Sequence, residues 1–540
     1  MHPMKITKKR LWLLPPNVFS PFSIIVLLAL VVSCSTTQQS GQNASQSELE
    51  VITSNETILQ MQKRMNQQQF SAQELTRFYL TKIKQNDHKY NSVIRVNPNA
   101  LQRAIELDRE RALGNLRGPL HGIPILVKDN IETADMPTTA GSLALANHLT
   151  KRDATLISNL RQAGAIILGK TNLSEWANIR SERSSSGWSA IGGQTRNPHD
   201  TNRSACGSSS GSGAAIAANF AVAAIGTETN GSITCPASVT GVVGIKPSVG
   251  WVSRFGIIPI SHTQDTAGPM TKNITDAAIL LQYMGSADQN DLTTLDDRLD
   301  RSVDLTPSSN SDRKLRLGLQ NSRATNHERV ALIESQLIEQ LQKRDWLTTK
   351  YLSHSPYQSF WKDTYTVLLY QLKNDLNRYF EQSTSDSKSW TLQKLIEFNR
   401  HNREQEMPFF QQEIFEKAQQ KGSLDNQEYQ EALNNVTKET QQSILQMLND
   451  NQLDAIIAIT RGPAWSIDRV NGDNVVGGVS TYSAVAGFPH ITIPLGKVHN
   501  LPIGLSIMGK RGDEQALINI AYQLENWIKT QDFRSGKPIE

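Results

Sequence analysis

Residues 120–285 alternate between short β-rich runs and segments rich in alanine and glycine. The β-rich runs include Ile123 to Val127, Ala165 to Gly169 and Val222 to Gly226. Such alternation is typical of an α/β fold, in which helices cover a sheet. The composition agrees, because 38% hydrophobic and 20% charged residues are enough for a soluble chain to bury a large core.

The composition changes over residues 286–449, which are richer in Gln, Asn, Lys and Ser and include polar helical stretches such as Leu392 to Gln420. We expect a helical subdomain inserted over the α/β core and forming part of a substrate pocket. Strand-like runs then return at Asp454 to Ile459, Ile491 to Leu495 and Ile503 to Met508. We therefore expect one interrupted domain over residues 49–530 rather than two independent domains.

Residues 50–85 have the apolar spacing of helices, and Ser71-Ala-Gln-Glu74 matches a capping box at the start of the second one. We expect this helical pair to cover the core.

The first 33 residues have the pattern of a signal peptide. Four basic residues, which account for the whole net charge of +4, precede an apolar run from Phe22 to Val32. Without them the chain is neutral, so its charge gives no support for nucleic-acid binding. The run has about 11 residues, against roughly 20 for a spanning helix. This favours export and cleavage over a transmembrane anchor.

Val31-Val32-Ser33-Cys34 resembles the lipobox of bacterial lipoproteins, in which the cysteine becomes the lipidated N-terminus. Residues 34–48 are polar and would act as a tether. Ser35 resembles the outer-membrane sorting pattern of two-membraned bacteria. We therefore expect a periplasmic protein anchored to the outer membrane through lipid on Cys34.

Two further cysteines, Cys206 and Cys235, are too few for a disulfide scaffold. They could pair in an oxidising periplasm or stay as two buried thiols, and the second interpretation is favoured.

Two serine-rich segments and one lysine are the candidates for chemistry. Cys206-Gly-Ser-Ser-Ser-Gly-Ser-Gly213 opens a predicted helix, and a predicted strand leads into Gly226-Thr-Glu-Thr-Asn-Gly-Ser232. A helix that runs out from a sheet edge and a strand that runs back bring both segments to that edge. Ser208 and Ser232 can therefore be neighbours. Lys128 ends an apolar strand; alone, it would be a surface lysine at a strand end.

Together these elements resemble the amidase signature family, over roughly residues 50–285 and 450–525. Besides the two serine segments, the matching features are Gly122 to Asp129, Thr138-Thr-Ala-Gly-Ser142, Gly169-Lys-Thr-Asn-Leu-Ser-Glu175, Asp265-Thr-Ala-Gly-Pro-Met270, Ala486-Gly-Phe-Pro489 and Leu501-Pro-Ile-Gly-Leu505. The resemblance implies a mixed β-sheet core flanked by helices. It also implies an enzyme that hydrolyses carboxamides to carboxylate and ammonia through an acyl-enzyme.

The resemblance assigns roles to individual residues. It makes Ser232 the nucleophile, Ser208 the bridging serine after a cis peptide bond, and Lys128 the base. The backbone N–H groups of Thr229, Asn230, Gly231 and Ser232 would form the oxyanion hole. Glu228 and Asn230 stand where the family more often has Asp and Gly.

The likeness is strongest to peptide amidases, which remove C-terminal amides from peptides. No metal or organic cofactor is implied. Four histidines have no metal-ligand spacing and are expected to be structural, namely His121, His199, His262 and His490.

Other functions remain open. Gly207-Ser-Ser209-Ser-Gly211 also fits the nucleophile elbow of an α/β-hydrolase, with His490 as its histidine. Ser385-Asp-Ser-Lys388 matches a Ser-x-x-Lys motif but lacks its companion motifs. A general aliphatic or aryl amidase and a non-catalytic exported binding lipoprotein are further alternatives. The amidase component of a tRNA-dependent amidotransferase is disfavoured, because it works in the cytoplasm and this chain begins with an export signal.

Overall fold

The computed structural model describes residues 45–308, 314–385 and 389–535. These described residues belong to one compact unit. The predicted signal peptide, Cys34 and most of the predicted tether lie outside the described residues. Within the described residues, no helix is long and apolar enough to cross a membrane.

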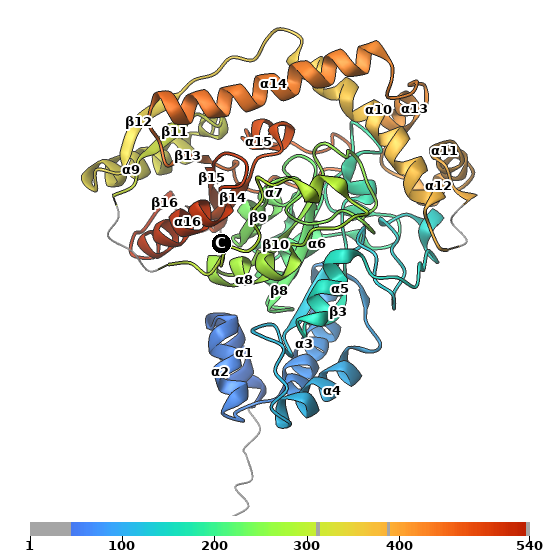
Figure 1. Cartoon of the computed structure of the whole chain (residues 1–540), viewed down its shortest axis with the longest axis vertical. Helices are drawn as coiled ribbons and strands as arrows, with labels where there is room; N and C mark the ends of the chain where they lie inside the picture. The colour runs from blue at the N-terminus through green and yellow to red at the C-terminus, as the bar shows by residue number, and fades with distance from the viewer. Residues whose placement is uncertain (1–44, 309–313, 386–388, 536–540) are drawn as a thin grey trace, which may run out of the picture. The chain divides into compact units, whose positions relative to one another are not determined.

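A mixed sheet of twelve strands forms the centre of the fold (Figure 1). Eleven strands follow one path: β1 (Val93–Val96), β3 (Ile166–Thr171), β2 (Pro124–Lys128), β8 (Ala223–Glu228), β10 (Thr266–Thr271), β9 (Val243–Lys246), β14 (His490–Val498), β15 (Leu501–Met508), β13 (Ala455–Ile459), β11 (Leu317–Gln320) and β12 (Leu347–Leu352). The twelfth, β16 (Arg534–Ser535), pairs with β14. The predicted α/β class is therefore confirmed.

All six β-rich runs predicted from sequence are strands, with ends shifted by a few residues. In β2, β3, β8, β13 and β15 every residue is buried. Strands covered on both faces are continuous apolar runs rather than alternating ones, which is why sequence located them. β2 is parallel to both β3 and β8, so the carboxyl ends of these three strands meet at one sheet edge.

Four helices precede or follow β1: α1 (Gln46–Asn55), α2 (Ile58–Asn66), α3 (Ala72–Asn86) and α4 (Ala100–Ala112). The predicted capping box starts α3: Ser71 Oγ accepts the backbone N–H of Glu74 at 3.1 Å, and Glu74 accepts that of Ser71 at 2.8 Å. The predicted tether over residues 34–48 needs a correction, because α1 already begins at Gln46, with Ser45 as its N-cap.

The segment 286–449 is not entirely helical, which corrects the sequence prediction. It contains β11 and β12, which are parallel to each other and extend the sheet beyond β13. Its helices are α9 (Glu328–Lys343), α10 (Phe360–Glu381), α11 (Leu392–His401), α12 (Arg403–Glu406), α13 (Glu413–Gln419) and α14 (Gln427–Asp450). The continuous helix predicted over 392–420 is interrupted twice, at Asn402 and after Glu406. The second break precedes Pro408, because a residue preceding proline avoids helical backbone.

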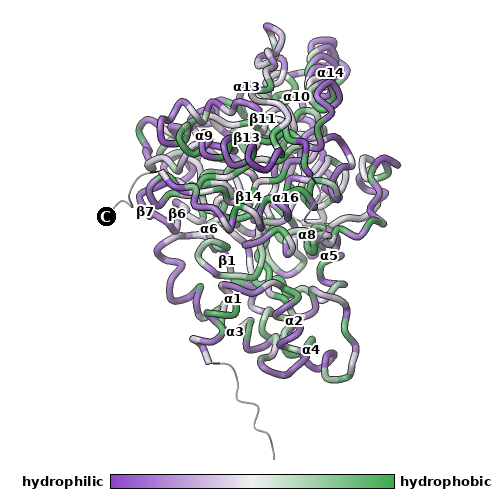
Figure 2. The backbone as a smooth tube through the Cα atoms, turned by 90° about the vertical axis from the view of Figure 1, so that its left-hand side faces the viewer, coloured by the Kyte–Doolittle hydropathy of each residue, from purple (hydrophilic) through white to green (hydrophobic). Residues whose placement is uncertain are grey.

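The long helices α10 and α14 pack against each other over the sheet (Figure 1). Figure 2 shows hydrophilic stretches along α14. The inner face of α10 shares a hydrophobic cluster with residues of the α/β part, including Leu145 and Ile258. Glu406 of α12 also accepts hydrogen bonds from Ser142 Oγ at 2.9 Å and from the backbone N–H of Leu143 at 2.6 Å. The segment is therefore joined to the core by both apolar and polar contacts.

Candidate active site

Lys128, Ser208 and Ser232 come together at the edge where the parallel strands end. Lys128 is the last residue of β2, next to the end of β8. Ser208 precedes α6 (Ser210–Ala217), and Ser232 lies between β8 and α7 (Thr234–Thr240). The backbone N–H of Ser209 donates to the carbonyl oxygen of Ser232 at 3.1 Å. The two serine segments are thus neighbours, as their order in the chain predicted.

Lys128 is enclosed by hydrogen-bond partners. Its Nζ lies 2.7 Å from Ser208 Oγ, 2.8 Å from Thr227 Oγ1 and 3.2 Å from the Thr227 carbonyl oxygen. Burial lowers the pKa of Lys128 to about 7, although the charges of Asp265 and Glu228 act in the opposite direction. At pH 7.4 more than half of such amines are neutral, against about one in a thousand for an ordinary lysine. A neutral amine can accept a proton from a hydroxyl.

The two serines differ in their exposure to solvent. Ser208 is fully buried, whereas Ser232 is 9% exposed. The peptide bond between Gly207 and Ser208 is cis, as the family resemblance implied. A side chain at Gly207 would place its Cβ 2.1 Å from Ser174 Oγ, so Ser174 would have to move to accommodate it. Among the residues that the structure describes, no hydrogen bond joins the hydroxyls of Ser208 and Ser232, and Ser232 is the more accessible of the two.

Glu228 holds the loop that carries Ser232. Its carboxylate accepts the backbone N–H groups of Gly231 at 2.8 Å, Ile233 at 2.8 Å and Thr234 at 3.0 Å. The N–H of Gly231 is therefore directed at Glu228 rather than at an oxyanion. Sequence reasoning noted Glu228 only as a departure from the family pattern. The three N–H groups that it binds become visible only when the loop is folded around it.

Three of the four predicted oxyanion donors remain without a backbone or side-chain acceptor among the described residues, namely the N–H groups of Thr229, Asn230 and Ser232. Side chains fix this stretch from both sides. Thr229 Oγ1 donates to Asp265 at 2.6 Å, and Asn230 accepts from Ser480 Oγ at 2.7 Å. Ser480 begins α15 (Ser480–Ala486). The free donors therefore belong to a backbone segment that side-chain hydrogen bonds hold in place, which suits stabilisation of a developing negative charge.

A disulfide joins the two serine segments. Cys206 is bonded to Cys235, so one sulfur lies two residues before Ser208 and the other three residues after Ser232. The favoured sequence interpretation, two unpaired buried thiols, is therefore wrong in this structure. The two cysteines are separated by 29 positions along the chain, and only the meeting of the two segments at one sheet edge brings them together.

A second buried lysine supports the strand ends. Lys170 of β3 lies 3.1 Å from Asp129 Oδ1 and donates to the carbonyl oxygen of Ile131 at 2.7 Å and to Thr138 Oγ1 at 3.0 Å. Both members of the ion pair are buried. Because Asp129 directly follows Lys128, this pair fixes the backbone at the end of β2. The matched motifs contained both residues, but no local signal showed that they pair.

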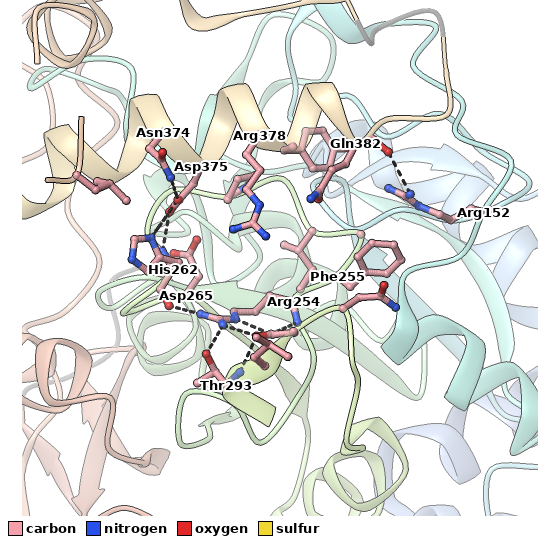
Figure 3. A pocket seen from close by; sticks show the side chains of 18 residues that line it. Arg152, Arg254, Phe255, His262, Asp265, Thr293, Asn374, Asp375, Arg378 and Gln382 are labelled. Atoms are coloured by element: carbon pink, nitrogen blue, oxygen red, sulfur yellow. Dashed lines mark hydrogen bonds and ion pairs between the residues drawn. The ribbon is translucent and has the colours of Figure 1, made fainter. Parts of the chain in front are cut away.

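A cavity of about 360 Å³ lies between α10 and the loop 254–265 (Figure 3). Arg254 donates to Asp291 at 2.7 Å, His262 lies 2.9 Å from Asp375, and the side chain of Arg378 extends from α10 toward the cavity. Asp265 lines the cavity and also accepts from Thr229, whereas Lys128, Ser208 and Ser232 are not among the lining residues. The cavity therefore borders the loop that carries Ser232, and α10 of the inserted segment forms one wall.

The residues of the competing motifs have other partners. Ser209 Oγ donates to the Thr227 carbonyl oxygen at 3.1 Å, and His490 Nε2 lies 2.6 Å from Ser506 Oγ. Ser209 and His490 therefore do not form an elbow pair. Of Ser385-Asp-Ser-Lys388, only Ser385 lies within the described residues. His121 and His199 bond the backbone carbonyls of Leu107 and Thr240, and the described residues contain no group of three metal-binding side chains.

Comparison with known proteins identifies the family. A model of the amidase family matches residues 74–518. The chain belongs to the amidase family. The amidase is similar to the native peptide amidase from Stenotrophomonas maltophilia, whose structure has been solved. The two are 41% identical, the match covers 89% of this chain and 98% of that one, and the TM-score is 0.83.

The amidase also resembles proteins with other names. A putative amidase of Schizosaccharomyces pombe is 34% identical over 88% of this chain and 85% of the relative. One component of the glutamyl-tRNA(Gln) amidotransferase of Pseudomonas syringae is 31% identical over 87% of this chain and 96% of the relative. Family membership and the peptide amidase likeness make this chain a hydrolase acting on the carbon–nitrogen bonds of amides.

Proposed function

We propose that this amidase releases ammonia from C-terminally amidated peptides, with Ser232 as nucleophile, Ser208 as proton bridge and Lys128 as base. One observation carries the assignment: the buried Lys128 amine lies 2.7 Å from Ser208 Oγ, beside the segment of the more accessible Ser232. The 41% identity to a peptide amidase supports the choice of substrate.

The chemistry follows from the proton path. As Ser232 Oγ attacks the carbonyl carbon, its proton passes to Ser208 Oγ, whose own proton passes to neutral Lys128. The path then reverses to protonate the departing nitrogen, so that ammonia leaves and an acyl ester remains on Ser232. Water attacks this ester by the same path, which releases the carboxylate and restores the hydroxyl.

The negative charge that develops on the carbonyl oxygen needs donors that are already in place. We assign this role to the N–H groups of Thr229, Asn230 and Ser232, which point to no other acceptor in the described part of the chain. The Gly231 N–H instead binds Glu228 and holds the loop in shape. Donors that need no rearrangement are the ones that lower the barrier most.

A panel of peptide amides tests the substrate. Mass spectrometry should show loss of the terminal amide with every internal bond intact, and Ser232→Ala should abolish the reaction. Activity confined to small aliphatic or aryl amides would favour a general amidase instead. A serine-directed fluorophosphonate should label native Ser232; label on Ser209 would support the elbow, and absence of label would support a non-catalytic binding protein.

We also propose export and lipid attachment at Cys34. The order of basic, apolar and lipobox segments supports it, and the disulfide between Cys206 and Cys235 agrees with an oxidising compartment. Two acyl chains would give stable membrane attachment. Cys34→Ala should block lipidation and processing at Ser33-Cys34. Unchanged processing and membrane retention in that variant would contradict the proposal.

A further inference from the structure

Arg461 lies beside residues 229–234, the nucleophile loop that carries Ser232. It follows β13 by two residues, and its guanidinium sits next to two glycines. A Cβ on Gly231, the residue before Ser232, would lie 3.7 Å from Arg461 Nη2. A Cβ on Gly478 would lie 2.7 Å from the same nitrogen. The absence of a side chain at Gly478 makes room for the guanidinium, and the 3.7 Å distance at Gly231 places it in contact range of the residue before Ser232.

This guanidinium has no partner within the described chain. No hydrogen bond or ion pair involves its nitrogens, and Nε is buried without an acceptor. Other arginines near the core are paired: Arg254 with Asp291 at 2.7 Å and Arg180 with Glu175 at 2.6 Å. Arg461 is half-buried, and leaving its buried Nε without an acceptor costs free energy, so its retention beside Ser232 points to a ligand.

The two carboxylates whose charges act on Arg461 already have other partners. Glu228 accepts three backbone N–H groups of the nucleophile loop. Asp473 accepts the backbone N–H of Ser186 at 3.1 Å and the indole N–H of Trp465 at 2.9 Å. Burial lowers the pKa of Arg461, although the charges of these two carboxylates act in the opposite direction. Arginine stays protonated in either case. It therefore presents a full positive charge and unused donors.

We propose that Arg461 binds a carboxylate of the substrate close to the scissile amide, so that the enzyme prefers peptide amides with Asp or Glu as the terminal residue. A guanidinium and a carboxylate can form two parallel hydrogen bonds, which fix orientation as well as adding affinity. A neutral side chain would leave the guanidinium unpaired, and a cationic side chain would be repelled. This inference rests on the proposed function, because it takes Ser232 as the reacting group.

Three peptides that differ only in the terminal residue test it: acetyl-Ala-Ala-Glu-amide, acetyl-Ala-Ala-Met-amide and acetyl-Ala-Ala-Lys-amide. In the wild type, kcat/KM should be about tenfold to a hundredfold higher for the Glu peptide than for the Met peptide, as expected for a charged hydrogen bond. The Lys peptide should be slowest. Most of the difference between the Glu and Met peptides should be in KM, which a general loss of structure would not produce.

Two variants separate recognition from folding. Arg461→Met should bring the Glu-to-Met ratio to about one, whereas Arg461→Lys, which keeps a charge, should retain part of the preference. Thermal melting checks that both variants fold, and the wild-type ratio is informative even if they do not. Equal rates in the wild type, or an unchanged ratio in Arg461→Met, would overturn the role of Arg461 alone. Failure to hydrolyse any of the three peptides would instead contradict the peptide-amide function on which it rests.

Discussion

The carboxylate of Glu228 accepts the backbone N–H of Gly231 at 2.8 Å, immediately before Ser232. The same carboxylate accepts the N–H groups of Ile233 and Thr234. A buried acid at the end of β8 therefore bends the following loop around itself. Its charge also raises the pKa of Lys128, against the effect of burial. Glu228 thus couples the shape of the loop to the protonation of Lys128.

Replacing Glu228 with Gln separates these two effects. The amide has one acceptor oxygen in place of two, so at least one loop N–H loses its partner, and we expect a fall in kcat of about tenfold to a hundredfold. Loss of the negative charge should lower the pKa of Lys128 further, so the rising limb of kcat/KM should move to lower pH. Glu228→Asp, which keeps the charge, should lose rate without this shift. A limb that moves to higher pH in Glu228→Gln would contradict the coupling.

The sequence predicted the centre of the fold because strands such as β2, β3 and β8 are buried on both faces and are therefore continuous apolar runs. It failed where polar residues form structure through distant partners. β11 and β12 were missed inside a polar segment, since β11 is a strand through pairing with the distant β13 and β12 through pairing with β11. The break before Pro408 had a local signal, the proline itself, but the helical spacing of the residues on either side favoured one continuous helix.

The candidate site, like the fold, was predicted only in part from the sequence. The order of helix and strand predicted that Ser208 and Ser232 meet, whereas the role of Lys128 came from family resemblance. The loop contacts of Glu228 and the isolation of Arg461 had no signal in sequence, because they depend on atoms brought together from distant parts of the chain. The pairing of Cys206 with Cys235 belongs to the same class, although the nearness of both cysteines to the serine segments was a usable hint.

The disulfide between Cys206 and Cys235 should stabilise the site. It closes a loop across 29 positions, for which the chain-entropy model gives about 3–4 kcal/mol. The double variant Cys206→Ala, Cys235→Ala should therefore unfold at lower denaturant concentration and lose activity before it unfolds, because both serine segments lose their cross-link. Wild type treated with a thiol reductant should behave like the variant, and the variant should not respond to reductant. Equal stability of oxidised and reduced wild type would contradict this role.

Lys128 should act as a base rather than as a fixed charge. We expect kcat/KM to rise with pH through a midpoint near 7, where burial places the pKa of Lys128, and then to level off. Lys128→Arg keeps the charge but cannot release a proton in this range. It should lose about a thousandfold or more, comparable to Lys128→Ala, because one step of proton transfer is removed. Retention of a tenth of the activity by Lys128→Arg would show that charge alone is sufficient.

The depressed pKa of Lys128 also predicts how stability depends on pH. In the folded chain the amine is neutral above about 7, whereas the unfolded chain keeps its proton up to the ordinary value of 10.5. Unfolding between these two pH values therefore takes up a proton, and the free energy of unfolding should rise with pH by up to about 1.4 kcal/mol per unit. Below pH 7 this dependence ends, since both states are protonated.

Lys128→Met removes the titrating group and isolates its contribution. Denaturant unfolding of both proteins from pH 7 to pH 10 should show the stability of the wild type rising relative to that of the variant, because only the wild type takes up this proton on unfolding. The variant should be the more stable protein near pH 7, where folding the wild type requires loss of a proton from the buried amine. Lys84→Met, at an exposed position of α3, controls for removal of a surface lysine. A constant difference between wild type and Lys128→Met across this range would mean that Lys128 keeps an ordinary pKa in the folded enzyme, which would also remove the basis for its role as a neutral base.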